Sequence, residues 1–567
     1  MTPLLKATRR SEVQSFYSQG EFEAWKETAG KGWTLKYYKG LGTSTPAEAQ
    51  EWFKELHEIK YTWCDETDES LSLAFSKKRA DDRKKWLAGY NPQRLLTLGP
   101  GGKVDFARFI HDELIHFSNA DNIRSLPHLI DGLKPSQRKI VFGCLKRGLT
   151  SEIRVAQLAG YVSEHAAYHH GEASLTGAIT SMAQTFVGAN NINLLAPIGQ
   201  FGSRLMGGKD AASARYIHTH LEPIVGTILR KEDTGILKHL DDDGLIVEPE
   251  CYWPTIPLLL MNGCVGIGTA FSTDIPPFNP NDILALLRDR LEGRRESLEN
   301  LALQPWWLGF KGRMTAVSDG VWVTRGLYTF DDAKKIVSIT ELPVGTWTND
   351  YKAFLDEMCV NKDMKNGKME DGKQALVNYD DLYNHVDVRF DLTLDPYYYE
   401  EAKANPAEFE KRFRLATTWR TSNMVCFDTQ MKIVRYTCVG DMLEAFYGPR
   451  LAKYEERRQK EMDRLKTEAV EADAKARFIR GVLEGTIELR RATDEQIVAA
   501  LQKADLPCIP VGTEGIDGYE YPTAPHGSCE GVSDPGCRGA GGEGSGCGFS
   551  TGGHDCEGDV APGSGRL

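Results

Sequence analysis

The 567-residue chain is moderately acidic, with a net charge of −12, 41% hydrophobic residues and 26% charged residues. This composition is ordinary for a soluble globular protein, and the length predicts about three or four domains of ~150 residues each. The charge excludes a uniformly basic nucleic-acid coat, and the absence of any apolar run of about 18 residues argues against a membrane span. Twelve scattered cysteines form no C-x-x-C pair, so neither a zinc site nor a redox motif is indicated. Without a secretory leader, we expect reduced thiols in an intracellular protein.

Residues 1–60 have the pattern of a small α/β unit. A charged helical run, EFEAWKE, leads to the alternating, strand-like WTLKYYKG, and a second helix follows in PAEAQEWFKEL. Ser44 or Thr45 can cap this second helix, with Pro46 at its first position. Glu48 then stands at the spacing of a capping box.

The middle of the chain contains three further patterns. Residues 61–104 are polar and end in LGPGGK, which predicts a connector. Between Phe106 and Leu229 we expect short helices with tight turns, including a basic amphipathic helix, KPSQRKIVFGCLKR, that ends before Gly148. Between residues 240 and 425, strand-like runs such as GLIVEP, GVWVTRGLYTF and KKIVSITEL alternate with helical ones, which predicts a separate α+β domain.

A long helix is predicted from Leu451 to Leu483, because apolar residues recur there in alternating steps of three and four. These seam residues are Met462, Leu465, Ala469, Ala472, Ala476, Ile479 and Leu483. The helix could pack on its own domain, but the charge density between the seam positions favours a projecting coiled coil. After Cys508 the sequence is rich in Gly, Ser and Asp and predicts a disordered tail, since it offers little apolar surface to bury.

The stretch AASARYIHTH places Arg215 directly before Tyr216, after a run of small residues. Taken alone, a tyrosine in such a strand packs its ring in a core. A phenol beside a guanidinium also suits phosphodiester transesterification, in which the phenol attacks phosphorus and cations stabilise the non-bridging oxygens. This chemistry fits a tyrosine recombinase as well as a topoisomerase.

Two neighbouring stretches are candidates for phosphate binding. The basic helix carries Lys134, Arg138 and Lys139 around its start, where backbone N–H groups attract anions. Its alternative role is a solvated charged face. The adjacent histidines of YHHGE, of which His170 is the second, could position a phosphate, or could be one surface and one core histidine.

A third candidate is the stretch PIGQFGSRLMGGKDAASARY. Its repeated glycines allow the backbone to approach another molecule closely. Arg204 and Lys209 add positive charge within it. The alternative is a mobile loop, which the spacing alone does not exclude.

Together these stretches resemble the eukaryotic-type DNA topoisomerase II family, over roughly residues 1–500. The matching signatures occur in the family's order and are KYYKGLGTST, SLAFSKK, DGLKPSQRK, VAQLAG, YHHGE, FVGANNINLL, PIGQFGSRL, GGKDAASARYI and VEPECYWPTIPLLLMNG. The resemblance implies a multidomain α+β fold. The implied parts are the C-terminal part of a Toprim domain (1–60), a linker (61–104), a winged-helix domain with the catalytic tyrosine (105–230), an α/β tower domain (231–428), an incomplete coiled-coil gate (429–508) and a disordered Gly-rich tail (509–567).

The resemblance also implies roles for individual residues. Tyr216 matches the nucleophile that becomes joined to the DNA 5′ phosphate, and Arg215 matches its neighbour at the scissile phosphate. Arg138 and His170 match residues that complete the phosphate site. Ile267, in GCVGIGTA, matches an isoleucine that wedges between base pairs and bends the duplex. The further residues expected to contact DNA are Lys134, Lys139, Arg204 and Lys209. Ala214 stands where the family often has proline, which we expect to loosen the turn.

The family's cofactors are Mg²⁺ and ATP, and the sequence contains neither set of ligands. In the family a Glu and an Asp-x-Asp set hold Mg²⁺ on the Toprim domain, and Gly-rich motifs bind ATP. The acidic run Asp241–Asp243 lies in a different context and is expected to be a loop. We also find no helix that returns from the coiled coil.

The resemblance implies an ATP-dependent enzyme that cleaves, passes and reseals double-stranded DNA, acting as a homodimer in the nucleus and without a membrane. Two alternatives remain open. The chain could be a DNA-binding fragment whose tyrosine is idle for want of metal. It could also be one component of a split topoisomerase, with a partner chain supplying the Toprim and ATPase parts.

Overall fold

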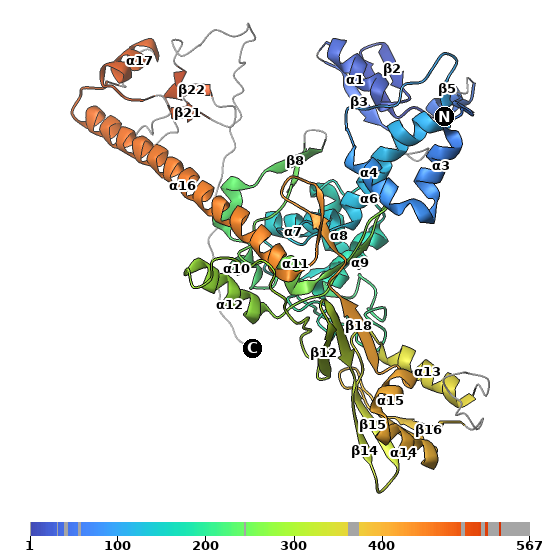
Figure 1. The fold of residues 1–567 in the computed structure, drawn as a ribbon. Helices are drawn as coiled ribbons and strands as arrows, with labels where there is room; N and C mark the ends of the chain where they lie inside the picture. The colour runs from blue at the N-terminus through green and yellow to red at the C-terminus, as the bar shows by residue number, and fades with distance from the viewer. Residues whose placement is uncertain are drawn as a thin grey trace, which may run out of the picture. The chain divides into compact units, whose positions relative to one another are not determined.

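The computed structural model shows a mixed α+β protein (Figure 1). It describes residues 2–30, 32–38, 44–54, 58–242, 245–360, 374–488, 494–507, 509–511, 516–519 and 532–533. The chain divides into two compact units, Met1–Arg457 and Arg458–Leu567. Each unit has apolar cores of its own.

The first residues form a small α/β unit, as the sequence predicts. Three antiparallel strands, in the order β2-β1-β3, share a core with helix α1 that includes Leu5, Ala7, Phe16 and Phe22. Burial alternates at the start of β1, so that one face of the sheet lies in this core. The bounds are β1 (Leu5–Arg9), β2 (Glu12–Phe16), α1 (Gln19–Thr28), β3 (Thr34–Tyr37) and α2 (Pro46–Lys54).

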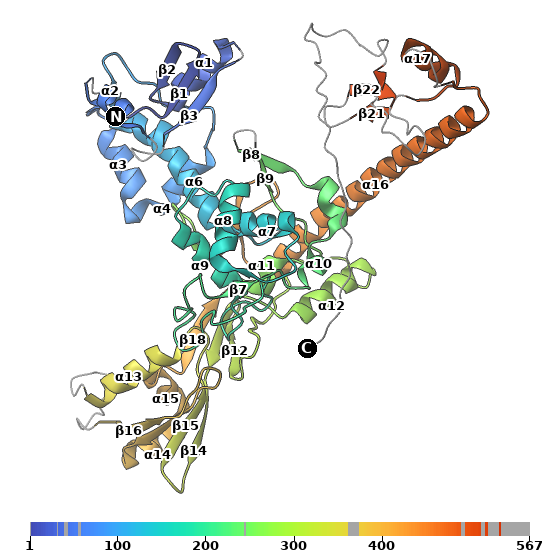
Figure 2. The same ribbon diagram turned by 180° about the vertical axis from the view of Figure 1, so that it is seen from behind.

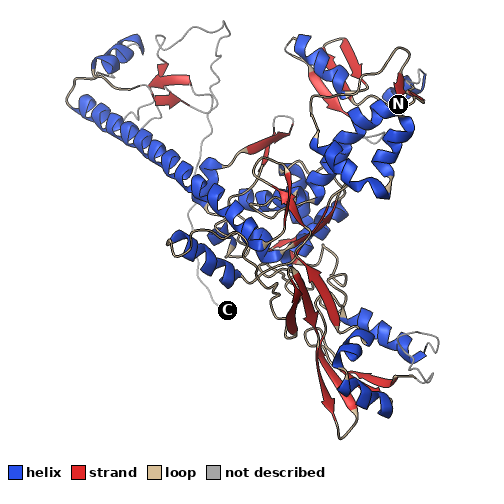
Figure 3. Ribbon diagram, viewed as in Figure 1, coloured by secondary structure: helices blue, strands red, loops and turns tan. Residues whose placement is uncertain are grey.

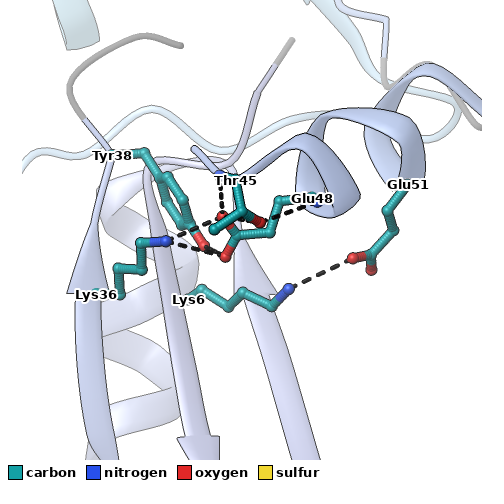
Figure 4. Close-up of polar contacts among 6 residues, drawn as sticks. All are labelled: Lys6, Lys36, Tyr38, Thr45, Glu48 and Glu51. Atoms are coloured by element: carbon teal, nitrogen blue, oxygen red, sulfur yellow. Dashed lines mark hydrogen bonds and ion pairs between the residues drawn. The ribbon is translucent and has the colours of Figure 1, made fainter. Parts of the chain in front are cut away.

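Helix α2 begins with the predicted capping box. The Thr45 N–H donates to Glu48 Oε2 at 2.8 Å, and the Glu48 N–H donates to Thr45 Oγ1 at 3.3 Å (Figure 4). The same carboxylate accepts hydrogen bonds from Lys36 Nζ at 2.9 Å and from Tyr38 Oη at 2.7 Å. These hydrogen bonds lower the pKa of Glu48 to about 2, and the bond from the Thr45 backbone has the largest effect. Residues 39–43 of the KYYKGLGTST stretch lie outside the described residues.

The segment 61–104 is folded, which corrects the expectation of a connector. It contains helices α3 and α4, and Arg83 Nη1 on α4 donates to the carbonyls of Leu73 and Ser76 at 3.0 and 2.7 Å. Short surface helices bury few side chains, so a polar composition does not exclude them. The bounds are β4 (Lys60–Thr62), α3 (Thr67–Phe75), η2 (Lys77–Arg79), α4 (Ala80–Ala88) and β5 (Lys103–Asp105), with β4 and β5 paired in parallel.

Helices α7, α8 and α9 lie close together, as Figures 1 and 2 show from opposite sides. They share one buried apolar core. Helix α7 starts at Pro135 and ends before Gly148, whose φ of 59° is left-handed, as the sequence predicts. Gly143 lies so close to Val162 of α8 that a Cβ would collide with it. The bounds are α5 (Phe106–Phe109), η3 (Ile110–Leu114), α6 (Ile115–Ser125), α7 (Pro135–Arg147), β6 (Ile153–Arg154), α8 (Val155–His165), α9 (Glu172–Ala183), β7 (His218–Thr219), α10 (Val225–Ile228) and η4 (Lys231–Ile236).

Two antiparallel hairpins follow, β8–β9 and β10–β11. Asp241 and Asp242 lie in β8 and pair with β9, which corrects the expectation that this acidic run is a loop; Asp243 lies outside the described residues. A second core, which includes Leu259 and Leu443, joins α11 and α12 to the start of α16. The bounds are β8 (His239–Asp242), β9 (Leu245–Pro249), α11 (Leu258–Asn262), β10 (Cys264–Ile267), β11 (Ser272–Ile275) and α12 (Pro280–Leu291).

Residues 313–420, called the sheet region here, contain the strands predicted in GVWVTRGLYTF and KKIVSITEL. One antiparallel sheet has the order β12-β13-β18 and another the order β14-β15-β17-β16. Their strands are drawn in red in Figure 3. Helices α13, α14 and α15 share the core of the second sheet, which includes Tyr351, Phe390 and Phe409. The bounds are β12 (Arg313–Ser318), β13 (Val321–Arg325), β14 (Leu327–Asp331), β15 (Ile336–Glu341), α13 (Thr348–Val360), β16 (Leu376–Asp381), β17 (Phe390–Leu394), α14 (Pro396–Ala404), α15 (Pro406–Arg412) and β18 (Ala416–Arg420), followed by β19 (Met424–Phe427) and β20 (Ile433–Tyr436).

The predicted long helix is present as α16 (Val439–Leu483). It begins earlier than the expected Leu451 because its first turns are buried through Met442 and Leu443. The large apolar residues of the predicted seam are exposed, and their pairing with another helix stays a prediction.

In the second unit, helix α17 (Asp494–Lys503) shares an apolar core with the end of α16, which includes Phe478 of α16, Leu501 of α17 and Ile487 of the connection between them. Three short antiparallel strands follow, within the part of the chain expected to be a disordered tail, so that expectation is wrong for these strands. They are β21 (Ile509–Val511), β22 (Ile516–Tyr519) and β23 (Val532–Ser533). The rest of 509–567 lies outside the described residues. Over the part of the chain that the structure describes, no helix has the length and apolarity needed to cross a bilayer.

Candidate functional site

Tyr216 stands on an exposed turn rather than in a core. Its side chain is 70% exposed, and its N–H donates to the Ser213 carbonyl at 2.9 Å, which closes the turn. The guanidinium of Arg215 lies 5.6 Å from the centre of the Tyr216 ring. The next residue, Ile217, is buried and anchors the segment in the core of α7, α8 and α9. The structure therefore presents the phenol and the guanidinium together to solvent.

Backbone hydrogen bonds fix this turn to the start of α8. The Ala156 N–H donates to the Ala214 carbonyl at 3.1 Å, and the Val155 N–H donates to the Ile217 carbonyl at 3.0 Å. The first N–H groups of a helix have no partner within the helix, so the turn satisfies two of them. Ala214 contributes through its carbonyl, which a proline at this position would also provide.

The glycine-rich loop, residues 199–210, is anchored and leads directly to the turn. Arg204 is buried, forms an ion pair with Glu341 of β15, and donates to the Leu342 carbonyl at 3.1 Å. A Cβ on Gly207 would collide with the ring of Trp347, so glycine allows the loop to lie against that side chain. The loop thus docks on the sheet region, and Arg204 faces a carboxylate rather than solvent.

Arg138 is also an internal residue, only 7% exposed. Its Nε and Nη2 donate to the two carboxylate oxygens of Asp131 at 2.8 and 3.0 Å, and Nη2 also donates to the Leu133 carbonyl at 2.9 Å. Burial alone would raise the pKa of Asp131, but the charge and hydrogen bonds of Arg138 hold it below its ordinary value. Lys139 Nζ donates to Glu248 at 2.9 Å, so Arg138 and Lys139 both have carboxylate partners.

Lys134 and Ile267 lie on connected elements. Lys134 Nζ donates to the Val265 carbonyl in β10, at 2.8 Å. Ile267 ends the same strand and is 81% exposed, as an inserting side chain requires.

The two histidines of YHHGE are both exposed, so neither is a core histidine. His169 Nε2 lies 2.9 Å from Asp242 Oδ2, whereas the His170 ring makes an edge contact with the ring of Tyr168. Among the described residues, no hydrogen bond or ion pair joins Tyr216 to Arg138 or to His170.

The predicted site residues therefore divide into two groups. The exposed ones include Tyr216, Arg215, His170, Lys209 and Ile267. The internally paired ones are Arg138, Lys139 and Arg204, whose partners are Asp131, Glu248 and Glu341. Sequence reasoning missed these three carboxylates. Only Asp131, inside the DGLKPSQRK stretch, lies near its partner in sequence, and nothing local distinguished the other two.

In the described ranges, no three His, Cys, Asp or Glu side chains gather closely enough to hold a metal ion. The acidic pair Asp241 and Asp242 lies in strand β8, and Asp242 faces His169.

The structure is that of a mixed α+β protein, in which an exposed tyrosine–arginine turn on a helical unit is joined to an antiparallel sheet region. Comparison with known proteins makes this specific. Residues 124–517 match the family of the A-type subunit of DNA gyrase/topoisomerase IV, and residues 1–122 match the C-terminal associated domain of TOPRIM. The second match extends through α3 and α4, beyond the expected boundary at residue 60. The chain belongs to the type II DNA topoisomerase family.

Individual relatives agree with this assignment. The chain is 43% identical over 531 residues to DNA topoisomerase 2 of Arabidopsis thaliana and 39% identical over 530 residues to that of Penicillium chrysogenum, which covers 91% and 92% of this chain. The matches cover 35% and 32% of those proteins, so the chain spans about a third of the length of these curated relatives. The crystal structure of the Plasmodium falciparum topoisomerase II DNA-binding, cleavage and re-ligation domain is similar at a TM-score of 0.74 and 38% identity, over 89% of this chain and 68% of that chain.

Proposed function

We propose that this chain is the DNA breakage-and-rejoining part of a type II topoisomerase, with Tyr216 as its nucleophile. The observation that carries the proposal is the exposed phenol beside Arg215 on a turn held by backbone hydrogen bonds. By analogy with the relatives, the substrate is double-stranded DNA, the active form is a homodimer and the compartment is the nucleus. Residues 105–230 would form the winged-helix domain, 231–428 the tower and 429–508 part of a coiled-coil gate.

In the proposed reaction the Tyr216 oxygen attacks a DNA phosphorus. A bond forms between that oxygen and phosphorus, the P–O3′ bond breaks, and the 3′ oxygen takes up a proton while the phenol loses one. The 5′ phosphate remains on the tyrosine, and reversal of the same step reseals the strand. Arg215 stabilises the charge on the non-bridging oxygens. Lys139, Arg138 and Arg204 would join it only after exchanging their carboxylate partners for phosphate.

Type II topoisomerases generally use Mg²⁺ and ATP. A partner chain that supplies the Toprim and ATPase parts is a second form of the proposal. The alternative is a DNA-binding fragment that does not cleave.

The test is covalent capture of DNA on the protein. End-labelled duplex is incubated with the chain and Mg²⁺, with and without a Toprim–ATPase partner chain, and adducts are counted after denaturation. Tyr216→Phe should bind DNA normally and form no adduct. Tyr397→Phe removes an equally exposed phenol, at 73%, and should change nothing. Equal adduct yields from wild type and Tyr216→Phe would refute the nucleophile, and DNA binding without adducts under either condition would identify the DNA-binding fragment.

A further inference from the structure

The hairpin that carries Ile267 is built from β10 and β11, with Ile267 paired to Ser272. Its tip is closed by a hydrogen bond from the Gly268 N–H to the Phe271 carbonyl at 2.9 Å. Successive side chains in a strand point to opposite faces, so the positions before and after Ile267 face away from the side on which it projects. Both of these positions are glycine.

These two glycines lie directly on helix α6. A Cβ on Gly266 would collide with the Ser125 carbonyl, and a Cβ on Gly268 would collide with the Asn122 side-chain oxygen. Neither glycine has a left-handed backbone, so what each provides is space. The hairpin therefore lies against the C-terminal turn of α6, with Ile267 on its opposite side.

Polar contacts fix the hairpin in that place. Thr269 Oγ1 donates to Asp121 Oδ2 of α6 at 3.0 Å. Lys134 Nζ, at the start of α7, holds the Val265 carbonyl at 2.8 Å. These hydrogen bonds connect β10 and the tip of the hairpin to α6 and to the start of α7, whereas the Ile267 side chain is 81% exposed.

We propose that the end of α6 is a seat that sets how far Ile267 projects into DNA. Gly266, Gly268 and the Thr269–Asp121 hydrogen bond are then positioning elements for the wedge. This inference rests on the wedge role that the family resemblance implies for Ile267. An apolar wedge must hold its position while base pairs unstack around it. A hairpin that no longer contacted the end of α6 would move away from the base pairs, and the DNA would stay unbent. The seat therefore governs DNA bending more than DNA affinity.

The experiment measures DNA bending by energy transfer between the two ends of a duplex bound to the full chain, with affinity measured on the same duplex. Thr269→Val keeps the volume but loses the hydrogen bond, and Thr269→Ser keeps the bond. We expect Thr269→Val and Gly268→Ala to lose most of the bend at saturating protein with little change in affinity, and Thr269→Ser to retain it. Gly160→Ala on α8, where a Cβ meets nothing within 4 Å, is the matched control.

Ile267→Ala separates the inference from the function on which it rests. If Ile267→Ala bends DNA as the wild type does, or if the wild type does not bend DNA, the wedge and its seat are both refuted. If Ile267→Ala abolishes the bend while Thr269→Val and Gly268→Ala retain it, only the seat is overturned. Should Gly268→Ala fold poorly, the comparison of Thr269→Val with Thr269→Ser still tests whether the end of α6 positions Ile267.

Discussion

The guanidinium of Arg204 and the carboxylate of Glu341 form an ion pair that is almost fully buried, with relative exposures of 5% and 2%. Glu341 also accepts hydrogen bonds from the N–H groups of Lys311 and Leu342, at 3.1 and 2.9 Å. The pair joins the glycine-rich loop to strand β15. Because that loop continues into the Tyr216 turn, the sheet region helps to determine where the phenol lies.

Arg204→Met should destabilise the protein by about 3–5 kcal/mol, because it leaves a buried carboxylate without its cation. The double variant Arg204→Met/Glu341→Gln removes both charges, keeps an acceptor for the backbone, and should recover most of this loss. Urea unfolding measures both effects. Lys403→Met breaks the exposed pair with Asp332 and should cost less than about 1 kcal/mol. Equal unfolding midpoints for Arg204→Met and Lys403→Met would contradict a stabilising role for the Arg204–Glu341 pair.

Arg138→Ala should lower the free energy of unfolding by about 3–5 kcal/mol, because Asp131 is fully buried and would lose its cation. Arg138→Met/Asp131→Asn should be markedly more stable than Arg138→Ala in thermal unfolding. If DNA affinity stays reduced in this double variant, Arg138 also contacts phosphate. An Arg138→Ala protein as stable as the wild type would show that the buried pair is unimportant.

Lys209→Ala should weaken DNA binding without changing stability, because Lys209 is exposed on the glycine-rich loop. Loss of one phosphate contact lowers the slope of log affinity against log salt by about 1. The measurement is a salt titration of affinity for one duplex. Lys466→Ala, an exposed lysine on α16, is the control and should leave the slope unchanged. A wild-type slope for Lys209→Ala would remove this residue from the DNA contact surface.

Glu48→Gln should destabilise helix α2 in a pH-dependent way. The pKa of Glu48 is lowered from 4.5 to about 2, so its ionised form stabilises the fold above about pH 4.5, and this contribution is lost as the pH falls through about 2. Glutamine preserves the capping-box geometry but not the charge. Hydrogen exchange of the α2 peptides, corrected for intrinsic rates, should differ between the two proteins at pH 6 and converge near pH 2. A difference that does not vary with pH would contradict the assignment.

Several local features were predictable from the sequence because each depends on residues a few positions apart. The Thr45–Glu48 capping box formed with Thr45 as the cap. Helix α7 runs from Pro135 to the residue before Gly148, as proline and glycine at those positions indicate. The folding of segment 61–104 was not predictable from its polar composition, because hydrogen bonds from Arg83 to the Leu73 and Ser76 carbonyls join its two helices.

The sequence by itself determined the family, because the family's signatures are contiguous motifs such as GGKDAASARYI, and the same motifs supply the residues proposed to carry the chemistry. Only the tertiary structure decided which of those residues meet solvent. Tyr216 and Ile267 are exposed, whereas Arg204 is neutralised by Glu341, far away in sequence. The physical reason is that a charge is buried only where folding brings an opposite charge to it, and no local pattern records which distant carboxylate that is.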